Sequence, residues 1–113
     1  MGGKLTKAKR GKRRWIGLKL SPTFTTRSVL EQTLQTIEHE INVSKPIRLY
    51  DFSPSKEHEL SGQAIVLLGL KYSNNFREFL SMNPQYGIES LTTSGKIRLV
   101  RERLGLSKAK MQK

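Results

Sequence analysis

The distribution of apolar and polar positions predicts four β-strands along the chain, the first two of them by strict alternation. These strands are expected over residues 15–20, 47–52, 63–70 and 86–91. In the first strand, Ile16, Leu18 and Leu20 fall on one face, which predicts that this face is buried. The third strand is a continuous apolar run, and such a run is typical of a central strand covered on both faces.

Apolar residues that recur every three or four positions predict a helix after the first strand. These residues are Val29, Leu30, Leu34, Ile37 and Ile41. Thr25 and Thr26 are candidate N-caps for this helix. Ser28 and Glu31 have the spacing of a capping box.

Two more helices follow the third and fourth strands. The second helix is expected to begin at a Ser73 cap and to bury an apolar face made of Phe76, Phe79 and Leu80. The third helix follows a turn over residues 92–95 and has an apolar stripe made of Ile97, Val100 and Leu104. Gly105 is expected to end this helix, with Leu106 making an apolar contact beyond it.

The predicted order of elements is β-α-β-β-α-β-α. This order indicates an α+β fold: a ferredoxin-like, RRM-like split β-α-β-β-α-β sandwich with an added C-terminal helix. One domain over residues 13–106 is expected. It would lie between a flexible basic N-terminal tail, residues 1–12, and a basic C-terminal tail, residues 107–113.

The excess positive charge is confined to the two ends of the chain. The sequence has 21 Lys and Arg residues against 9 Asp and Glu, a formal net charge of +12. Seven of the basic residues lie in 1–14 and seven in 96–113, whereas residues 15–95 are nearly neutral. Two blocks of one sign around a near-neutral domain are typical of a protein that binds a polyanion, and nucleic acid is favoured over a membrane surface.

The composition argues against several other classes of protein. The chain has no cysteine, which excludes a disulfide framework, a thiolate zinc site and a cysteine nucleophile. Its apolar runs are much shorter than the roughly 20 residues of a membrane span. No apolar segment of a secretory signal follows the basic N-terminus. We therefore expect a cytoplasmic protein with no membrane partner.

Residues that catalysis would need are sparse. His39 and His58 are the only histidines, and neither has a partner at the spacing of a helical zinc site. Glu57 and Glu59 fall in a polar loop, where nothing is expected to shift the pKa of a carboxyl group. We expect no catalysis by the polypeptide itself and no cofactor or metal bound by it.

Residues at the first strand and around the last helix are the candidate RNA contacts. They are Arg13, Arg14, Ser94, Gly95, Lys96, Arg98, Arg101 and Arg103. The turn before the last helix can present N–H and hydroxyl groups to a phosphate beside Lys96, although an ordinary Ser/Thr cap has the same pattern. Arg98 and Arg101 are expected on the side of the helix away from its apolar stripe. If the first strand and last helix adjoin, these residues form one basic face.

The sheet is not expected to stack RNA bases. The third strand, residues 63–70, contains neither an aromatic nor a basic residue. A tryptophan that opens a strand, as Trp15 does, is more often a core residue than a base-stacking one. A sheet face that is buried or covered by a protein partner is the better interpretation.

Two segments resemble ribonuclease P protein component 2, the small α/β subunit shared by archaeal and eukaryotic ribonuclease P. Arg13-Arg14-Trp15-Ile16-Gly17-Leu18-Lys19-Leu20 is similar to the family's opening strand. Thr93-Ser94-Gly95-Lys96-Ile97 and the basic helix through Arg103 are similar to its closing Ser-Gly-Thr-Ile segment and basic helix. Trp15 stands where Tyr is usual in the family, Leu18 where an aromatic is common and Lys96 where Thr is usual.

The resemblance implies an RNA-binding subunit of an RNA-based endonuclease that removes 5′ leaders from precursor tRNA. The RNA would carry out the chemistry with magnesium ions, and the protein would neutralise phosphates and stabilise the catalytic RNA. The implied partners are ribonuclease P RNA, precursor tRNA, the barrel-shaped ribonuclease P protein component 3 and other protein subunits, assembled as a dimer of heterodimers. A small ribosomal protein that binds rRNA is the alternative, because that class also combines basic tails with a compact α/β domain.

Overall fold

The structure, a computed structural model, describes residues 12–43, 45–55 and 61–105. Its elements are, in chain order, β1 (Arg13–Leu20), α2 (Arg27–Ile41), β2 (Arg48–Ser53), β3 (Gly62–Gly69), α3 (Leu70–Met82), the 3-10 turn η1 (Pro84–Tyr86), β4 (Ile88–Ser94) and α4 (Ile97–Leu104). The strands form one antiparallel sheet in the order β2-β3-β1-β4. The fold is therefore α+β, a four-stranded antiparallel sheet with three helices. Leu106 and most of both predicted tails lie outside the described residues.

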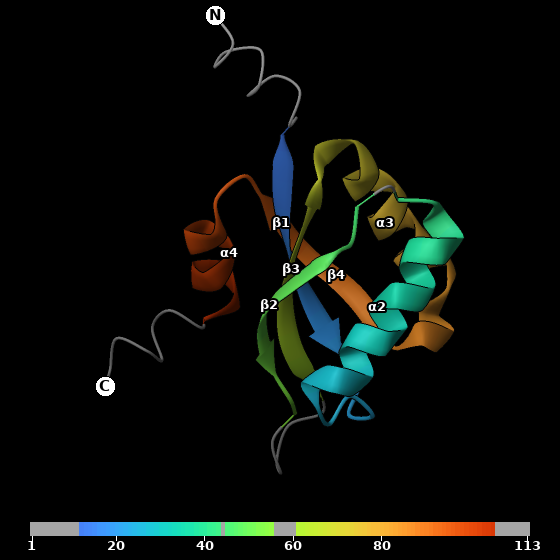
Figure 1. Cartoon of the computed structure of the whole chain (residues 1–113). Coiled ribbons are helices and arrows are strands. Elements are labelled where there is room, and N and C mark those ends of the chain that lie inside the picture. Colours follow the sequence, from blue (N-terminus) through green and yellow to red (C-terminus); the bar gives the residue numbers. More distant parts are fainter. Residues whose placement is uncertain (1–11, 44, 56–60, 106–113) are drawn as a thin grey trace, which may run out of the picture.

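The main core lies between one face of the sheet and the layer formed by α2 and α3 (Figure 1). The predicted inner face of β1 is confirmed, because Ile16, Leu18 and Leu20 are all buried there. α2 contributes the buried residues Leu30, Leu34 and Ile37 at the predicted helical spacing. β3 lies between β2 and β1 and is buried on both faces, as its unbroken apolar run predicted.

The short helix α4 covers the opposite face of the sheet (Figure 1). Gly17 allows it to approach β1, because a Cβ atom at this position would lie 3.1 Å from side-chain atoms of Thr92, Val100 and Leu104. Val100 is fully buried in this contact. Gly105 ends the helix at a φ of 80°, in the left-handed region that favours glycine, as the sequence predicted.

One predicted helix start is wrong and another is confirmed at Thr26. α3 begins at Leu70 directly after β3, so Ser73 lies inside the helix, 5% exposed, and does not cap it. The prediction was wrong because β3 runs into the helix at Gly69 without a loop that could supply a capping residue. α2 begins after Thr26, whose hydroxyl accepts the N–H of Val29 at 3.3 Å, and Ser28 lies within its first turn.

The fourth strand is displaced toward the C-terminus from its predicted position. It covers Ile88–Ser94 instead of 86–91, because η1 occupies the preceding residues through Tyr86. Thr92 and Thr93, which the sequence placed in a turn, pair with Gly17 and Ile16 of β1. β-branched residues favour this pairing on a pleated surface. The turn to α4 is therefore shorter than expected, which brings the helix close to the end of the sheet.

Candidate nucleic-acid interface

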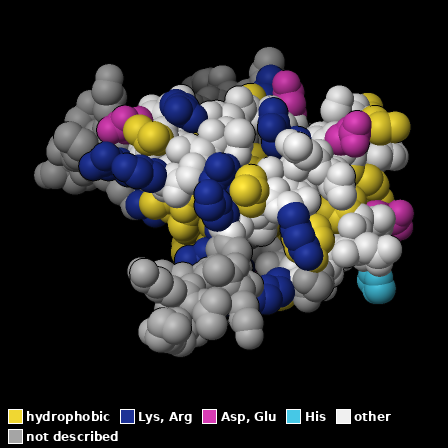
Figure 2. Space-filling view, turned by 90° about the horizontal axis from the view of Figure 1, so that it is seen from above, with side chains coloured by type: hydrophobic (Ala, Val, Ile, Leu, Met, Phe, Trp, Pro, Cys, Tyr) yellow, Lys and Arg dark blue, Asp and Glu magenta, His cyan; other side chains and the backbone are white. Residues whose placement is uncertain are grey.

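One end of the sheet collects basic residues from four elements and from both ends of the sequence. At this end β1 and β2 begin and β3 and β4 finish, since Arg13 is paired with Gly69, Trp15 with Ser94 and Arg48 with Leu67. We call the following residues the basic end: Lys12, Arg13, Arg14, Arg48, Lys71, Lys96 and Arg98. Figure 2 views the molecule from this direction and shows Lys and Arg side chains spread across it, with acidic side chains toward its rim.

Arg14 joins the first strand to the turn before α4. An added Cβ atom at Gly95 would lie 3.3 Å from Nη1 of Arg14, so this guanidinium lies against the turn. The same nitrogen donates to the carbonyl of Arg13 at 3.2 Å. The condition set by the sequence, that the first strand and the last helix adjoin, is met, and the two basic blocks approach each other here.

The turn from β4 to α4 holds its own N–H groups in place. The Ser94 hydroxyl oxygen accepts the backbone N–H of Lys96 at 3.1 Å. Lys96 is the N-cap of α4, has an extended backbone and contributes no side-chain capping bond. The first turn of α4 contains no acidic residue. The positive end of the helix dipole thus lies beside the exposed Lys96 and Gly95, an arrangement that favours an anion.

Arg101 does not belong to the exposed basic surface, and its predicted orientation was wrong. Its Nε and Nη2 donate to the two carboxylate oxygens of Asp51 at 2.7 and 3.1 Å, across the sheet on β2. At 100° per residue, position 101 falls beside Val100 and Leu104 and not opposite them. The two hydrogen bonds that Arg101 donates to the Asp51 carboxylate raise the pKa of Arg101 above its ordinary value, which keeps the guanidinium charged. Arg101 therefore fastens α4 to the sheet.

Arg103 also makes an internal contact. Its Nη1 donates to the Thr92 hydroxyl at 2.8 Å and to the Thr93 carbonyl at 3.1 Å, which connects α4 to the edge strand β4. Arg98 and Arg103 are both exposed. Of the three predicted arginines of the last helix, Arg98 is the one that lies at the basic end, whereas Arg101 and Arg103 bond to the strands β2 and β4.

The structure adds residues that the sequence prediction missed. Arg48 and Lys71 are exposed at the basic end, but they lie in the near-neutral middle of the sequence, so the charge blocks did not reveal them. Tyr50 packs its ring against Trp15 with centroids 4.6 Å apart and an interplanar angle of 76°. Only the pairing of β1 and β2 with β3 brings these aromatic residues together.

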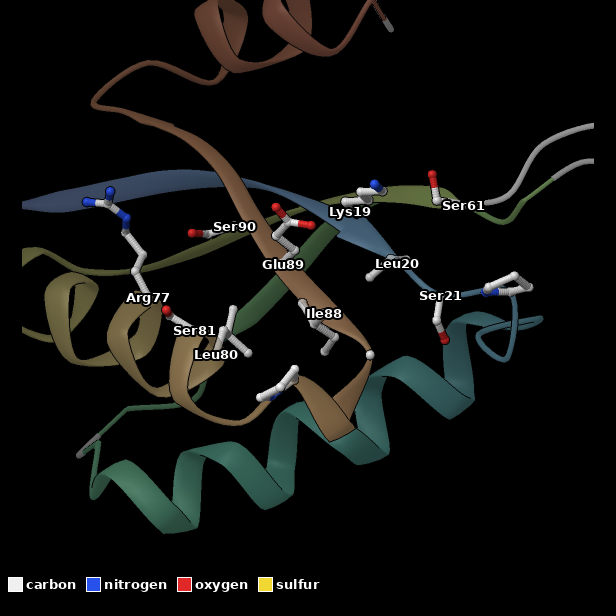
Figure 3. Close-up of a pocket in the computed structure, with 13 residues that line it drawn as sticks. Lys19, Leu20, Ser21, Ser61, Arg77, Leu80, Ser81, Ile88, Glu89 and Ser90 are labelled. Atoms are coloured by element: carbon white, nitrogen blue, oxygen red, sulfur yellow. The ribbon is translucent and has the colours of Figure 1, made fainter.

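A groove lies away from the basic end, between α3 and the start of β4 (Figure 3). It has a volume of about 580 Å³ and its charged lining residues are Lys19, Arg77 and Glu89. This mixture of signs, with an open mouth, does not resemble an enclosed catalytic pocket. Within residues 12–43, 45–55 and 61–105, no group of three or more His, Cys, Asp or Glu could hold a metal ion.

The two histidines give no catalytic arrangement in the part of the chain that the structure describes. His39 is exposed in the last turn of α2. His58, together with Glu57 and Glu59, lies outside the described residues. No helix among the described residues is long and apolar enough to span a membrane.

Comparison with known proteins adds no assignment: no family model, no curated protein and no solved structure matches the chain. The functional interpretation therefore depends on the geometry of the basic end and on the residues themselves.

Proposed function

We propose that this chain is an RNA-binding protein subunit of ribonuclease P, which stabilises the catalytic RNA for removal of 5′ leaders from precursor tRNA. The observation that supports it best is the approach of Arg14 to the Gly95 turn, which unites two basic blocks from opposite ends of the sequence. The strand order supports classifying the fold as ferredoxin-like and RRM-like, with α4 as the addition.

The proposed mechanism is electrostatic. The exposed residues Arg13, Lys96 and Arg98 neutralise phosphates beside the N-terminal end of α4, where the helix dipole favours an anion. Each neutralised phosphate releases condensed counterions, so the slope of log affinity against log salt changes by about 0.9 per phosphate on duplex and about 0.7 on single strands. The RNA and its magnesium ions supply the chemistry of cleavage.

The choice of ribonuclease P is supported by the opening and closing segments of the fold, which resemble those of protein component 2. The proposed partners are ribonuclease P RNA, precursor tRNA, ribonuclease P protein component 3 and other protein subunits, in a cytoplasmic complex that forms a dimer of heterodimers. The edge of β4 that pairs with no other described strand is the surface proposed for these proteins.

The test is a reconstitution with ribonuclease P RNA, magnesium and precursor tRNA. We expect the full chain, together with protein component 3, to lower the magnesium concentration required for cleavage at the mature 5′ end. The double variant Arg13→Gln and Arg98→Gln should lose most of this stimulation. A variant of the same net charge, Lys19→Gln and Arg77→Gln, changes two exposed residues of the groove away from the basic end and should retain it.

Equal losses in the two double variants would contradict the basic end as the RNA contact. Unchanged cleavage with the wild-type chain, together with its co-purification with ribosomal subunits, would replace ribonuclease P by the ribosomal alternative. Co-purification with a single ribonuclease P-type RNA would exclude that alternative.

A further inference from the structure

A row of side chains crosses the sheet beside α4 at the basic end. By register, Arg48, Leu67, Trp15 and Ser94 lie side by side on β2, β3, β1 and β4. Because side chains two residues apart on a strand share a face, Arg13 lies on the same face, one row nearer the start of β1. This face therefore contains an aromatic ring together with two arginines, Arg13 and Arg48, both of which are exposed.

A β-bulge brings Tyr50 to Trp15. The register between β2 and β3 shifts between Leu49 and Asp51, so Tyr50 is the extra residue of the bulge. Bulges re-aim side chains, and here the phenol ring meets the indole edge to face, with centroids 4.6 Å apart. The Arg27 guanidinium of α2 donates hydrogen bonds to the backbone carbonyls of Leu49 and Tyr50. These two bonds restrain the backbone of the bulge. The aromatic pair is thus held in place before any ligand arrives.

Packing of the core does not account for this pair. Leu67, which lies next to Trp15 in the row, is already 3% exposed, and Ile65 in the next row is fully buried. Tyr50 nevertheless remains 40% exposed, and Trp15 is half-buried. An amphipathic ring left partly open on an otherwise closed sheet face is available for contact with another molecule.

The charges around the pair favour an anionic ligand. The acidic residue nearest to it in the sheet is Asp51, in the adjacent row, and its carboxylate accepts two hydrogen bonds from Arg101. Arg13 lies two residues before Trp15 on β1, Arg48 lies two residues before Tyr50 on β2, and both arginines are exposed to solvent. Aromatic faces flanked by cations are the arrangement with which proteins bind single-stranded nucleic acid: bases stack on the rings, and phosphates follow the cations.

We propose that Trp15 and Tyr50 form a stacking site for an unpaired RNA base, with Arg13 and Arg48 holding the flanking phosphates. This site extends the proposed RNA-binding function, on which it depends, from phosphate neutralisation to recognition of a single-stranded segment. Stacking discriminates unpaired from paired nucleotides because bases within a duplex do not expose their faces. It therefore revises the expectation from the sequence that the sheet stacks no bases.

The test uses the full chain and its natural fluorescent reporter, since Trp15 is the single tryptophan. The ligands are a short single-stranded oligoribonucleotide and the same oligomer with abasic residues at its centre, so that length and phosphate charge match. We expect the intact oligomer to quench Trp15 emission and to bind about 5- to 150-fold more tightly than the abasic one. This comparison uses the wild-type protein and does not depend on whether a variant folds.

Variants then locate the contact, with affinity measured by anisotropy of the labelled oligomer. Tyr50→Leu should bring the affinity for the intact oligomer close to that for the abasic one, and should leave the affinity for the abasic oligomer unchanged. Tyr86→Leu is the matched control, because Tyr86 is a half-buried tyrosine that packs against the core and Phe79, away from the basic end. It should preserve the difference between the two oligomers.

Equal affinity for the two oligomers, with unchanged Trp15 emission, would overturn the stacking site. Burial of Trp15 on addition of protein component 3, without any dependence of RNA binding on bases, would also overturn it and assign this face to a protein contact. The proposed function fails separately, through unchanged ribonuclease P cleavage in the reconstitution. A positive base-dependent quench with no stimulation of cleavage would retain the stacking site and reject the ribonuclease P assignment.

Discussion

The two faces of the sheet are built on different principles. The face under α2 and α3 is closed by a continuous apolar core that includes the fully buried Phe76. The face under α4 is covered by an eight-residue helix, and the contact combines Val100 on Gly17 with the charged pair of Arg101 and Asp51. The first face determines stability, whereas the second leaves arginines and aromatic rings at its margin, where a ligand can reach them. If the proposed stacking site binds RNA, stability and recognition are separated on opposite sides of one sheet.

The largest effect is expected on the core face. Phe76→Ala removes a ring that is 0% exposed and should lower the free energy of unfolding by about 3–5 kcal/mol, because the transfer energy of the ring is lost and a cavity is left. Denaturant titration followed by circular dichroism measures it. Met82→Ala, at a side chain that is 73% exposed, is the control and should change stability by less than about 0.5 kcal/mol. Similar values for the two variants would mean that this face is not the main core.

A smaller loss is expected where α4 approaches β1. Gly17→Val forces a branched side chain against Val100 and Leu104, both 3.1 Å from an added Cβ atom, and should cost about 1–3 kcal/mol by overpacking. Within residues 12–43, 45–55 and 61–105, proteolysis of this variant should cut α4 first, while β1 to β3 remain protected. A substitution that leaves both stability and protection intact would show that α4 does not need this close contact.

The charged pair on the same face should contribute less than the core. Asp51→Asn should lower the free energy of unfolding by about 1–2 kcal/mol. This loss lies between those typical of exposed and of buried ion pairs, because the side chains of Arg101 and Asp51 are 30% and 19% exposed. The loss of stability caused by Asp51→Asn should be the same at neutral and at mildly alkaline pH. The folded-state pKa of Arg101 is raised, so its stabilising contribution is complete below the unfolded-state pKa and is lost only as pH rises through the folded value.

The exposed pair of Arg27 and Glu31 provides the matched control for this comparison. It joins residues four apart on α2 at 3.4 Å, with side chains 46% and 51% exposed. Glu31→Gln should cost no more than about 0.5 kcal/mol. If the two carboxylate variants cost the same, the bond from Arg101 does not fasten α4 to the sheet.

The sequence predicted what depends on periodicity and failed where contacts join distant residues. The buried faces of β1 and α2, the central position of β3 and the end of α4 at Gly105 were predicted correctly, because each depends on local spacing or on one glycine. The contacts of Arg101 with Asp51 and of Tyr50 with Trp15 were not predicted. One depends on Asp51, fifty positions away, and the other on a bulge that only strand pairing creates. The charge blocks indicated Arg13 and Arg98 but gave no sign of Arg48.

The smallest change in stability, and the sharpest difference in function, is expected between Arg98 and Arg101 on the same helix. Arg98→Gln removes an exposed guanidinium at the basic end and should change the free energy of unfolding by less than about 0.5 kcal/mol. The same substitution should reduce the slope of log affinity for RNA against log salt concentration by about 0.7 to 0.9, because one phosphate contact is lost.

Arg101→Gln should show the reverse, because its guanidinium already bonds Asp51. It should lower the free energy of unfolding and leave nearly the same salt slope as the wild-type chain. Binding titrations at several salt concentrations, made well below the unfolding midpoint of each variant, measure the slopes. An unchanged slope for Arg98→Gln would remove Arg98 from the RNA contact, and a reduced slope for Arg101→Gln would mean that RNA competes with Asp51 for the arginine that holds α4 in place.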